Sequence, residues 1–468
     1  MRTHTLIGAI LVVLGAAGAP AAMAQSPSAL AALKGLAPVA ALDNSAAGKA
    51  ALAANLRVTG AIQQGASRQP ALLPFADQQQ QALRDGFITW GNACELADAL
   101  GTRLGGAYRA LATYRSADDG RTAQFTSVAP SLAALIAYAS ATTSADAGSG
   151  KYFFANGTTD GAAPASREAM AILEAAKGVT DIFGKAYGLP GGGPAADAYG
   201  DSRPYQTEHE VLTFKGEDYF GLRSDSVFYL HGPVQDLVKS PSFPSGHTTY
   251  GYTESLLLAL VVPERYPQMV ARAAEYGNSR IVLGAHYAMD VLGGRTVALH
   301  DLAQLLANRP GYVGVERDGL TIADFPQALA AARADARKAL EAACHAPVAS
   351  CARDDASRFA SPARDEAFTE STQTYGLPAI FPATARRRED VGALAPEAGH
   401  LLTAAFPWLT LAQADAILTA TEGPGGGFLD DGSAFGVYSR LDLYRASRRA
   451  LALDPAGAKP RRAPRPRR

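Results

Sequence analysis

The chain has 468 residues, of which 48% are hydrophobic and 19% are charged. This is the composition of a globular protein, because disordered chains contain fewer apolar residues and collagen-like chains repeat glycine at every third position. The 43 basic and 44 acidic side chains give a net charge of −1, so nucleic-acid binding is not expected.

The chain begins with the features of a secretory signal peptide. Arg2 precedes an apolar stretch over residues 6–19, and Ala22-Met23-Ala24 has small residues where a cleavage site requires them. The stretch is shorter than the ~20 residues that span a bilayer. We therefore expect a periplasmic or secreted protein, cleaved near Ala24 and without a membrane span. An uncleaved membrane anchor is the alternative.

The rest of the chain is predicted to be mainly helical. Residues 25–75 are rich in Ala, Ser, Gln and Pro and are expected to form a loose lead-in with one short helix. From Asp77 onward apolar side chains recur every three or four residues, which is the period of an amphipathic helix. Helices are expected over residues 77–100, 122–142, 166–186, 248–262, 264–276, 281–307 and 322–344. Short strands are allowed at residues 211–214 and 227–230.

The C-terminal part is predicted to be a further helical extension over residues 385–450. Thr410 and Gln413 fit a capping box before an apolar helical run. The last ten residues contain six basic side chains and three prolines, which is typical of a solvated tail.

The chain has only three cysteines, Cys94, Cys344 and Cys351. In an oxidising compartment Cys344 and Cys351 are close enough in sequence to close a small disulfide loop. The alternative is that all three are reduced and buried, as small apolar side chains often are. No Cys-x-x-Cys occurs, so zinc ribbons and thioredoxin-type redox centres are not expected.

Three short motifs follow one another in the second part of the chain. The first is Arg203-Pro204, and the second is Pro244-Ser245-Gly246-His247 at the start of a predicted helix. The third is Ser279-Arg280, followed after five residues by His286 and after three more by Asp290.

This set resembles the signature of the superfamily that contains type 2 phosphatidic acid phosphatases, bacterial non-specific acid phosphatases and vanadium haloperoxidases. The resemblance covers residues 185–300 and implies an all-α helical bundle of the acid phosphatase/vanadium haloperoxidase type, with no divalent metal. We therefore predict a signal peptide (1–24), a loose lead-in (25–75), a catalytic domain (76–310), a helical C-terminal extension (311–455) and a basic disordered tail (456–468).

The residue types of the second and third motifs fit phosphate chemistry. Ser245 and Gly246 stand at a helix N-terminus, where free N–H groups and the helix dipole attract anions. An ordinary N-cap is the other role open to Ser245. His286 and Asp290 are four residues apart and would share a helix face, so the carboxylate can fix one ring nitrogen and leave the other as a nucleophile. His247 is the natural proton donor to the leaving group.

Arg203 and Arg280 are expected to bind phosphate oxygens, because guanidinium groups match them bidentately. Surface ion pairs are the alternative for both. One position departs from the family pattern, which has a lysine seven residues before the first motif's arginine, where this chain has Ala196. Lys185 and Lys239 are near in sequence, but their spacing does not place either in the site.

Three functions are compatible with these residues. The favoured one is an exported phosphatase that hydrolyses small phosphate monoesters through a phosphohistidine on His286, without metal or other cofactor. The second is a vanadium-dependent haloperoxidase that holds vanadate on His286, and the third is a non-catalytic anion-binding envelope protein. A soluble substrate is favoured over a lipid because no span is expected. The sequence leaves open whether the chain forms a homo-oligomer.

Overall fold

The computed structural model describes residues 26–86, 93–112, 114–116, 123–125, 127–154, 158–159, 163–164, 167–168, 171, 203–207, 216–217, 223–224 and 241–455. The signal peptide, the basic tail, the two possible strands, Lys185, Ala196 and Lys239 lie outside these residues, as does nearly all of the helix expected over 166–186.

The fold is all-α, as predicted. The helices are α1 (Pro27–Leu36), α2 (Ala46–Gln63), α3 (Phe75–Asp85), α4 (Thr102–Leu111), α5 (Pro130–Phe154), α8 (Pro204–Thr207), α9 (Gly246–Val261), α10 (Tyr266–Val282), α11 (Ala288–Leu306), α12 (Phe325–Cys344), α13 (Val348–Cys351), α14 (Pro362–Thr372), α15 (Pro382–Ala385), α16 (Val391–Leu394), α17 (His400–Thr403), α18 (Leu411–Thr421) and α19 (Leu443–Ala452). The 3-10 helices are η1 (Ala37–Asn44), η2 (Glu95–Leu100), η3 (Pro263–Arg265), η4 (Pro396–Gly399) and η5 (Gly436–Arg440).

The described strands are short and pair only as two-stranded antiparallel hairpins. They are β1 (Tyr114–Ser116) with β2 (Ala123–Phe125), β3 (Thr158–Thr159) with β4 (Ala163–Pro164), β5 (Gly216–Glu217) with β6 (Arg223–Ser224), and β7 (Glu316–Arg317) with β8 (Leu320–Thr321).

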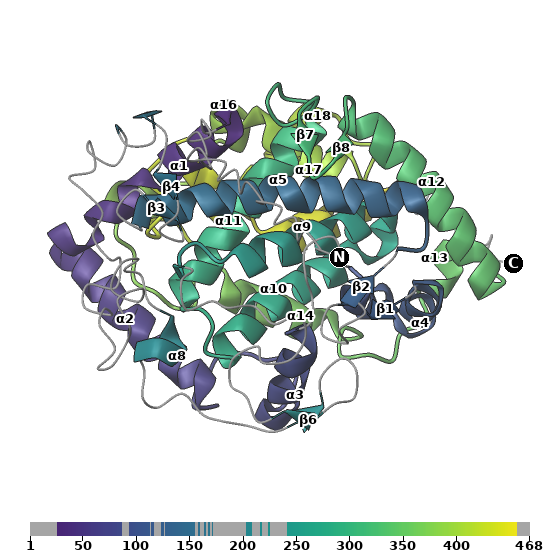
Figure 1. Ribbon diagram of the computed structural model, residues 1–468, viewed down its shortest axis with the longest axis horizontal. Coiled ribbons are helices and arrows are strands. Elements are labelled where there is room, and N and C mark those ends of the chain that lie inside the picture. Colours follow the sequence, from purple (N-terminus) through teal and green to yellow (C-terminus); the bar gives the residue numbers. More distant parts are fainter. Residues whose placement is uncertain are drawn as a thin grey trace, which may run out of the picture.

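The centre of the molecule is formed by α5, α9, α10 and α11. In Figure 1, α5 runs across the molecule with α9, α10 and α11 beneath it, and α12 and α2 lie at opposite edges. Every residue of α9 from His247 to Val261 is buried, which is the pattern of a helix enclosed on all sides by other elements. The two central helices α5 and α9 also share polar contacts, since Ser140 donates to Glu254 over 3.2 Å.

Several helices begin and end close to where local signals predict. Ser245 caps α9, and Thr410 and Gln413 form the expected capping box of α18. The helix expected over 281–307 instead starts at Ala288, because α10 continues to Val282 and the chain then turns through Gly284 at a φ of 71°. This turn carries His286.

The N-terminal segment differs from the loose lead-in that its composition suggested. It forms α1, η1 and α2, and the side chains of Ser26 and Ser45 accept hydrogen bonds at the starts of the two α-helices. These helices form because alanine has a high helix propensity. Their large apolar side chains pack against the rest of the protein, and Leu33 and Leu36 are fully buried.

The C-terminal helices pack onto the central ones. Apolar residues of α18 and α19 belong to the same buried cluster as those of α9 and α10. Tyr266 at the start of α10 donates a hydrogen bond to the carbonyl oxygen of Leu401 over 2.9 Å. Within the described part of the chain, no helix combines the length and hydropathy needed to cross a bilayer.

The three cysteines are buried and are not linked by disulfide bonds in the structure. Of the two alternatives from the sequence, the structure therefore has the one with buried thiols. Burial and the neighbouring thiol of Cys351 raise the pKa of the Cys344 thiol to about 11.

Candidate active site

The side chains of the three motifs meet where α9 and α11 begin. Arg203 immediately precedes α8, Arg280 lies in the last turn of α10, and Asp290 lies in the first turn of α11. Backbone hydrogen bonds tie the segments together: the amide of Ser245 donates to the carbonyl of Asp290, and that of Tyr205 to Gly284, both over 3.0 Å. The site is therefore built from segments far apart in sequence.

Two imidazole rings face each other at this point. Nδ1 of His247 lies 3.2 Å from Nε2 of His286. The ring centroids are 5.5 Å apart and the planes meet at 66°. His286 is fully buried and His247 is 7% exposed, so both rings lie inside the protein.

The neighbours of His286 determine which of its nitrogens is free to react. Nη1 of Arg203 lies 3.1 Å from Nε2 of His286, and a guanidinium group can only donate. Nε2 therefore carries the lone pair, and the ring proton is on Nδ1, which lies 3.3 Å from Oδ2 of Asp290. This tautomer presents Nε2 as the nucleophile.

Asp290 has a second role that sequence reasoning did not anticipate. Its Oδ2 accepts the backbone amide of Tyr287 over 2.8 Å, so the carboxylate also caps α11. His286 itself lies in the turn before α11, and the expectation that the pair shares a helix face is wrong. Burial raises the pKa of Asp290, opposed by the hydrogen bonds from Ser242 and Tyr287.

Arg280 is the most unusual group of the site. Its side chain is fully buried, and none of its three guanidinium nitrogens has a hydrogen-bond partner among the residues that the structure describes. Its Cζ lies 4.7 Å from the centroid of the Tyr276 ring. A buried charge without partners is costly, and this arrangement is the one expected where an anion binds.

The positive charges of the site act on both histidines. Burial, and then the charges of Arg280 and Arg203, hold the pKa of His247 well below its ordinary value. Burial and Arg203 lower the pKa of His286 in the same way. Burial and these positive charges therefore favour the neutral form of both rings when no anion is bound.

Ser245 and Gly246 are placed as predicted at the start of α9. The Ser245 hydroxyl accepts the amide of Thr248 over 3.1 Å, so the ordinary N-cap role is real. A Cβ built on Gly246 would meet no described atom within 4 Å. The described atoms therefore do not require glycine there, and they leave space beside the first residue of α9, whose free N–H groups attract anions.

Two residues near the histidines were missed by sequence reasoning. Ser242 donates to Oδ2 of Asp290 and lies 3.3 Å from Nδ1 of His286, and its closeness to the second motif was the available signal. Lys151 of α5 contacts the carbonyl of Pro241, and its spacing in the sequence gave no signal. Ser279, the first residue of the third motif, donates to Asp85 over 2.7 Å.

The N-terminus of α11 is also held by α2. The amide of Ala288 donates to the hydroxyl of Thr59 over 3.1 Å, and that of Met289 donates to Oδ1 of Asn55 over 2.9 Å. Asn55 and Thr59 are almost fully buried. Two otherwise unpaired amides of a helix end are thus satisfied from a segment more than 200 residues earlier.

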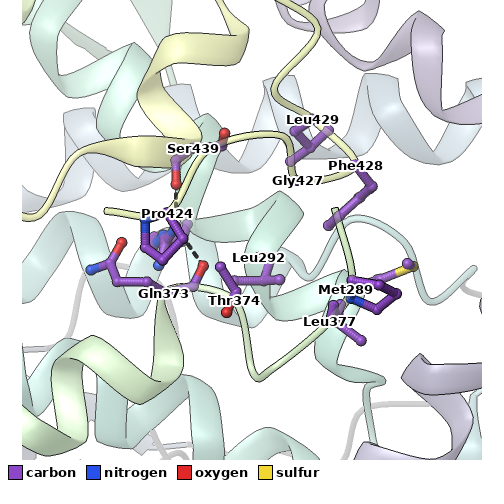
Figure 2. Close-up of a pocket in the computed structure, with 12 residues that line it drawn as sticks. Met289, Leu292, Gln373, Thr374, Leu377, Pro424, Gly427, Phe428, Leu429 and Ser439 are labelled. Atoms are coloured by element: carbon purple, nitrogen blue, oxygen red, sulfur yellow. Dashed lines mark hydrogen bonds between the residues drawn. The ribbon is translucent and has the colours of Figure 1, made fainter. Parts of the chain in front are cut away.

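A separate small hollow, with a cavity volume of about 30 Å³, lies beside α11. Figure 2 shows Met289 and Leu292 of α11 facing Leu377, Phe428 and other side chains of the C-terminal segment. Leu292 lies about 200° around the helix from Asp290, and no motif residue lines this hollow. It is distinct from the histidine site. No group of three or more metal-binding side chains comes together among the residues described.

Comparisons with known proteins agree with the three motifs. Residues 191–303 match a family described as the PAP2 superfamily.

Individual proteins with similar sequences are acid phosphatases. A non-specific acid phosphatase of Salmonella typhimurium is 44% identical over 69 residues, which are 15% of this chain and 28% of that protein. An acid phosphatase of Zymomonas mobilis is 41% identical over 71 residues, covering 15% and 27%. A non-specific acid phosphatase of Providencia stuartii is 32% identical over 150 residues, covering 29% and 57%. These matches span between 27% and 57% of the relatives' own lengths, and they confirm the resemblance found in the sequence.

Proposed function

We propose, from the match of residues 191–303 to the PAP2 superfamily, that the chain is an exported, metal-independent phosphatase that hydrolyses phosphate monoesters. The observation that carries the proposal is the facing pair of His247 and His286 together with the buried guanidinium of Arg280, which has no hydrogen-bond partner among the described residues. The acid phosphatases that it resembles support the same activity.

In the first step, the lone pair on Nε2 of His286 attacks phosphorus, and the bond between phosphorus and the ester oxygen breaks. The leaving oxygen takes a proton from His247. A phosphate monoester is partly protonated at mildly acidic pH, because its second pKa is about 6. Its negative charge offsets Arg203 and Arg280, so His247 can take up this proton and pass it to the leaving group.

In the second step, water attacks the phosphorus of the phosphohistidine and the P–N bond breaks. His247, now neutral, accepts the proton that water loses. Asp290 keeps the proton of His286 on Nδ1 through both steps, so Nε2 is regenerated as a nucleophile. Arg203 and Arg280 stabilise the charge on the equatorial oxygens, which is the task that a metal ion performs in other phosphatases.

The test is a phosphoenzyme trap combined with a nucleophile variant. The wild-type protein, incubated with a chromogenic phosphomonoester at mildly acidic pH and quenched, should carry phosphate on His286 by mass spectrometry. His286→Ala should lower kcat about 10⁴-fold or more, and a chelator should leave the wild-type rate unchanged. The matched control is His345→Asn, because His345 is exposed and its φ of 51° suits asparagine.

Three outcomes would overturn the proposal. Normal turnover by His286→Ala would exclude the phosphohistidine. Peroxide-dependent bromination after addition of vanadate, without phosphatase turnover, would favour a haloperoxidase. Binding of phosphate without any turnover would favour an anion-binding protein.

Export and a soluble substrate complete the proposal. Export rests on Arg2, the apolar stretch 6–19 and Ala22-Met23-Ala24, which have the pattern of a cleaved signal peptide. A small soluble monoester is proposed over a lipid phosphate because neither the sequence nor the described helices provide a membrane-spanning segment.

A further inference from the structure

The end of α5 lies directly against the loop that carries the second motif. A Cβ built on Gly150 would lie 2.7 Å from Cδ of Pro244 and 3.0 Å from its Cγ. Only a residue without a side chain fits at this distance. The close approach places the next residue, Lys151, in the last turn of α5, beside the residues that precede His247.

Lys151 and Arg203 share one acceptor. Nζ of Lys151 donates to the carbonyl oxygen of Pro241, and Nη2 of Arg203 donates to the same oxygen over 3.3 Å. Through its other nitrogen, Arg203 contacts Nε2 of His286 over 3.1 Å. The ammonium group of Lys151 and the guanidinium of Arg203 therefore bind the same carbonyl oxygen, and this guanidinium also contacts the proposed nucleophile.

The charge of Lys151 reaches the reactive side chains. Besides burial and the two arginines, it contributes to lowering the pKa of His247 and of His286. It also favours the ionised form of Asp290, against the burial that raises the pKa of this carboxyl. A cation that acts on all three groups is close enough to act on a phosphate bound between them.

We propose that Lys151 binds the substrate phosphate together with Arg203 and Arg280, supplying from α5 the positive charge that Ala196 does not. This assignment rests on the proposed phosphate site, although it does not require turnover. A purely structural role is the competing explanation, because a lysine in the last turn stabilises a helix by interacting with the carbonyl end of its dipole.

The experiment compares Lys151→Met with Lys151→Arg. Lys151→Met should weaken binding of inorganic phosphate, measured by calorimetry, by about 10- to 100-fold, the effect expected when one charged hydrogen-bonding partner is lost. It should raise KM for the phosphomonoester by a similar factor. Lys151→Arg, which keeps the charge, should recover most of the binding. The matched control is Lys338→Met, at an exposed position in the middle of α12, which should change neither quantity.

The phosphate-binding measurement is repeated with the Lys151 variants made in the His286→Ala protein. Phosphate affinity is then measured without any contribution from turnover. The proposed activity could then fail while the Lys151 result stands. Phosphate affinity that is unchanged in Lys151→Met would overturn the assignment. A loss of phosphate affinity that Lys151→Arg does not recover would also overturn the assignment, because the assignment depends on a positive charge at position 151.

Discussion

The buried guanidinium of Arg280 lowers the stability of the unliganded protein and favours the binding of an anion. Its guanidinium has lost its hydration, and within the described structure no acceptor replaces the lost water. Such a group lowers the free energy of unfolding. Arg272, two turns earlier in α10, is equally buried but pairs with Asp85 and Asp98. Two equally buried arginines on one helix thus differ in whether the described residues provide acceptors for their N–H groups.

Replacing Arg280 by methionine should therefore leave the unliganded protein as stable as the wild type, or make it more stable. Inorganic phosphate should raise the Tm of the wild type, as any ligand of the native state does, and should raise that of Arg280→Met much less. The variant's kcat/KM should fall about 10²-fold or more. Thermal unfolding with and without phosphate, together with steady-state kinetics, checks these expectations.

The control is Arg272→Met, which removes the ion-pair partner of the fully buried Asp85 and leaves Asp98 with Arg358. This variant should be strongly destabilised, by about 3–5 kcal/mol. If Arg280→Met lost as much stability as Arg272→Met, that result would show that Arg280 does have stabilising partners in the unliganded protein.

Sequence reasoning found the residues that the proposed mechanism uses, but not Lys151 or Ser242, which the structure places beside them. His247, His286, Asp290 and the two arginines stand in short motifs whose chemistry can be recognised locally. Lys151 stands alone, 52 positions before Arg203. Only the approach of α5 to Pro244 brings it to the site, and a tertiary contact of this kind has no signature in spacing.

At the scale of elements, the site depends on how closely α11 approaches the start of α9. A Cβ on Gly294 would lie 2.4 Å from the carbonyl oxygen of Ser245 and 2.9 Å from Cβ of Thr248. A Cβ on the preceding Gly293 would lie 2.7 Å from the Phe243 ring. The paired glycines let α11 pack against the loop backbone, and this contact sets the distance between His247 and His286.

Gly294→Ala should therefore push the two helices apart. We expect a loss of about 1–3 kcal/mol in the free energy of unfolding, as for other overpacked positions, together with a lower kcat because the imidazoles separate. The control is Gly148→Ala in α5, where no described atom lies within 4 Å of the added methyl group. That variant should gain about 0.5–1 kcal/mol. Chemical denaturation measures both, and equal effects would contradict the packing.

The helices that could be predicted are those with a clear beginning or a regular apolar period. Residues Gly246–Val261 and Leu411–Thr421 follow recognisable caps, and α12 has regularly spaced apolar residues. Only one short helix was expected where α1, η1 and α2 lie, because alanine-rich sequence shows little contrast between the faces of a helix. The hairpin of β1 and β2 lies where a helix over 122–142 was expected to begin, and strands of three residues are too short to show an alternating pattern.

At the scale of the whole molecule, buried acids make stability depend on pH. Asp146 of α5 and Asp301 of α11 are both buried, and burial raises the pKa of each well above its ordinary value. The groups that face them are His300, whose Nδ1 lies 2.8 Å from Asp301, and Arg317. A carboxyl with a raised folded-state pKa stabilises the fold fully below the unfolded-state pKa of about 4 and loses that contribution as pH rises through the folded value.

The Tm should accordingly decline between pH 5 and pH 8. Burial also raises the pKa of Asp365 and of Glu422 to about 7, which acts in the same direction. Buried histidines act in the opposite direction: His300, whose pKa burial lowers to about 4, and His247 and His286, whose pKa values burial also lowers. A single variant therefore gives the cleaner measurement. Asp146→Asn, which mimics the protonated carboxyl, should reduce the decline by roughly 2 °C or more. An identical pH profile in calorimetry would show that Asp146 is ionised in the native state.

The caps that Asn55 and Thr59 provide for α11 lie outside the stretch that matches the superfamily, residues 191–303. That stretch holds the turn that bears His286 through its own contacts, such as the hydrogen bond from Tyr205 to Gly284, but not through these two caps. On the other flank, Phe428 packs edge-on against Phe243, with ring centroids 6.2 Å apart. A fragment limited to residues 191–303 would lose both outside supports, so we expect it to hold the two histidines less firmly than the full chain does.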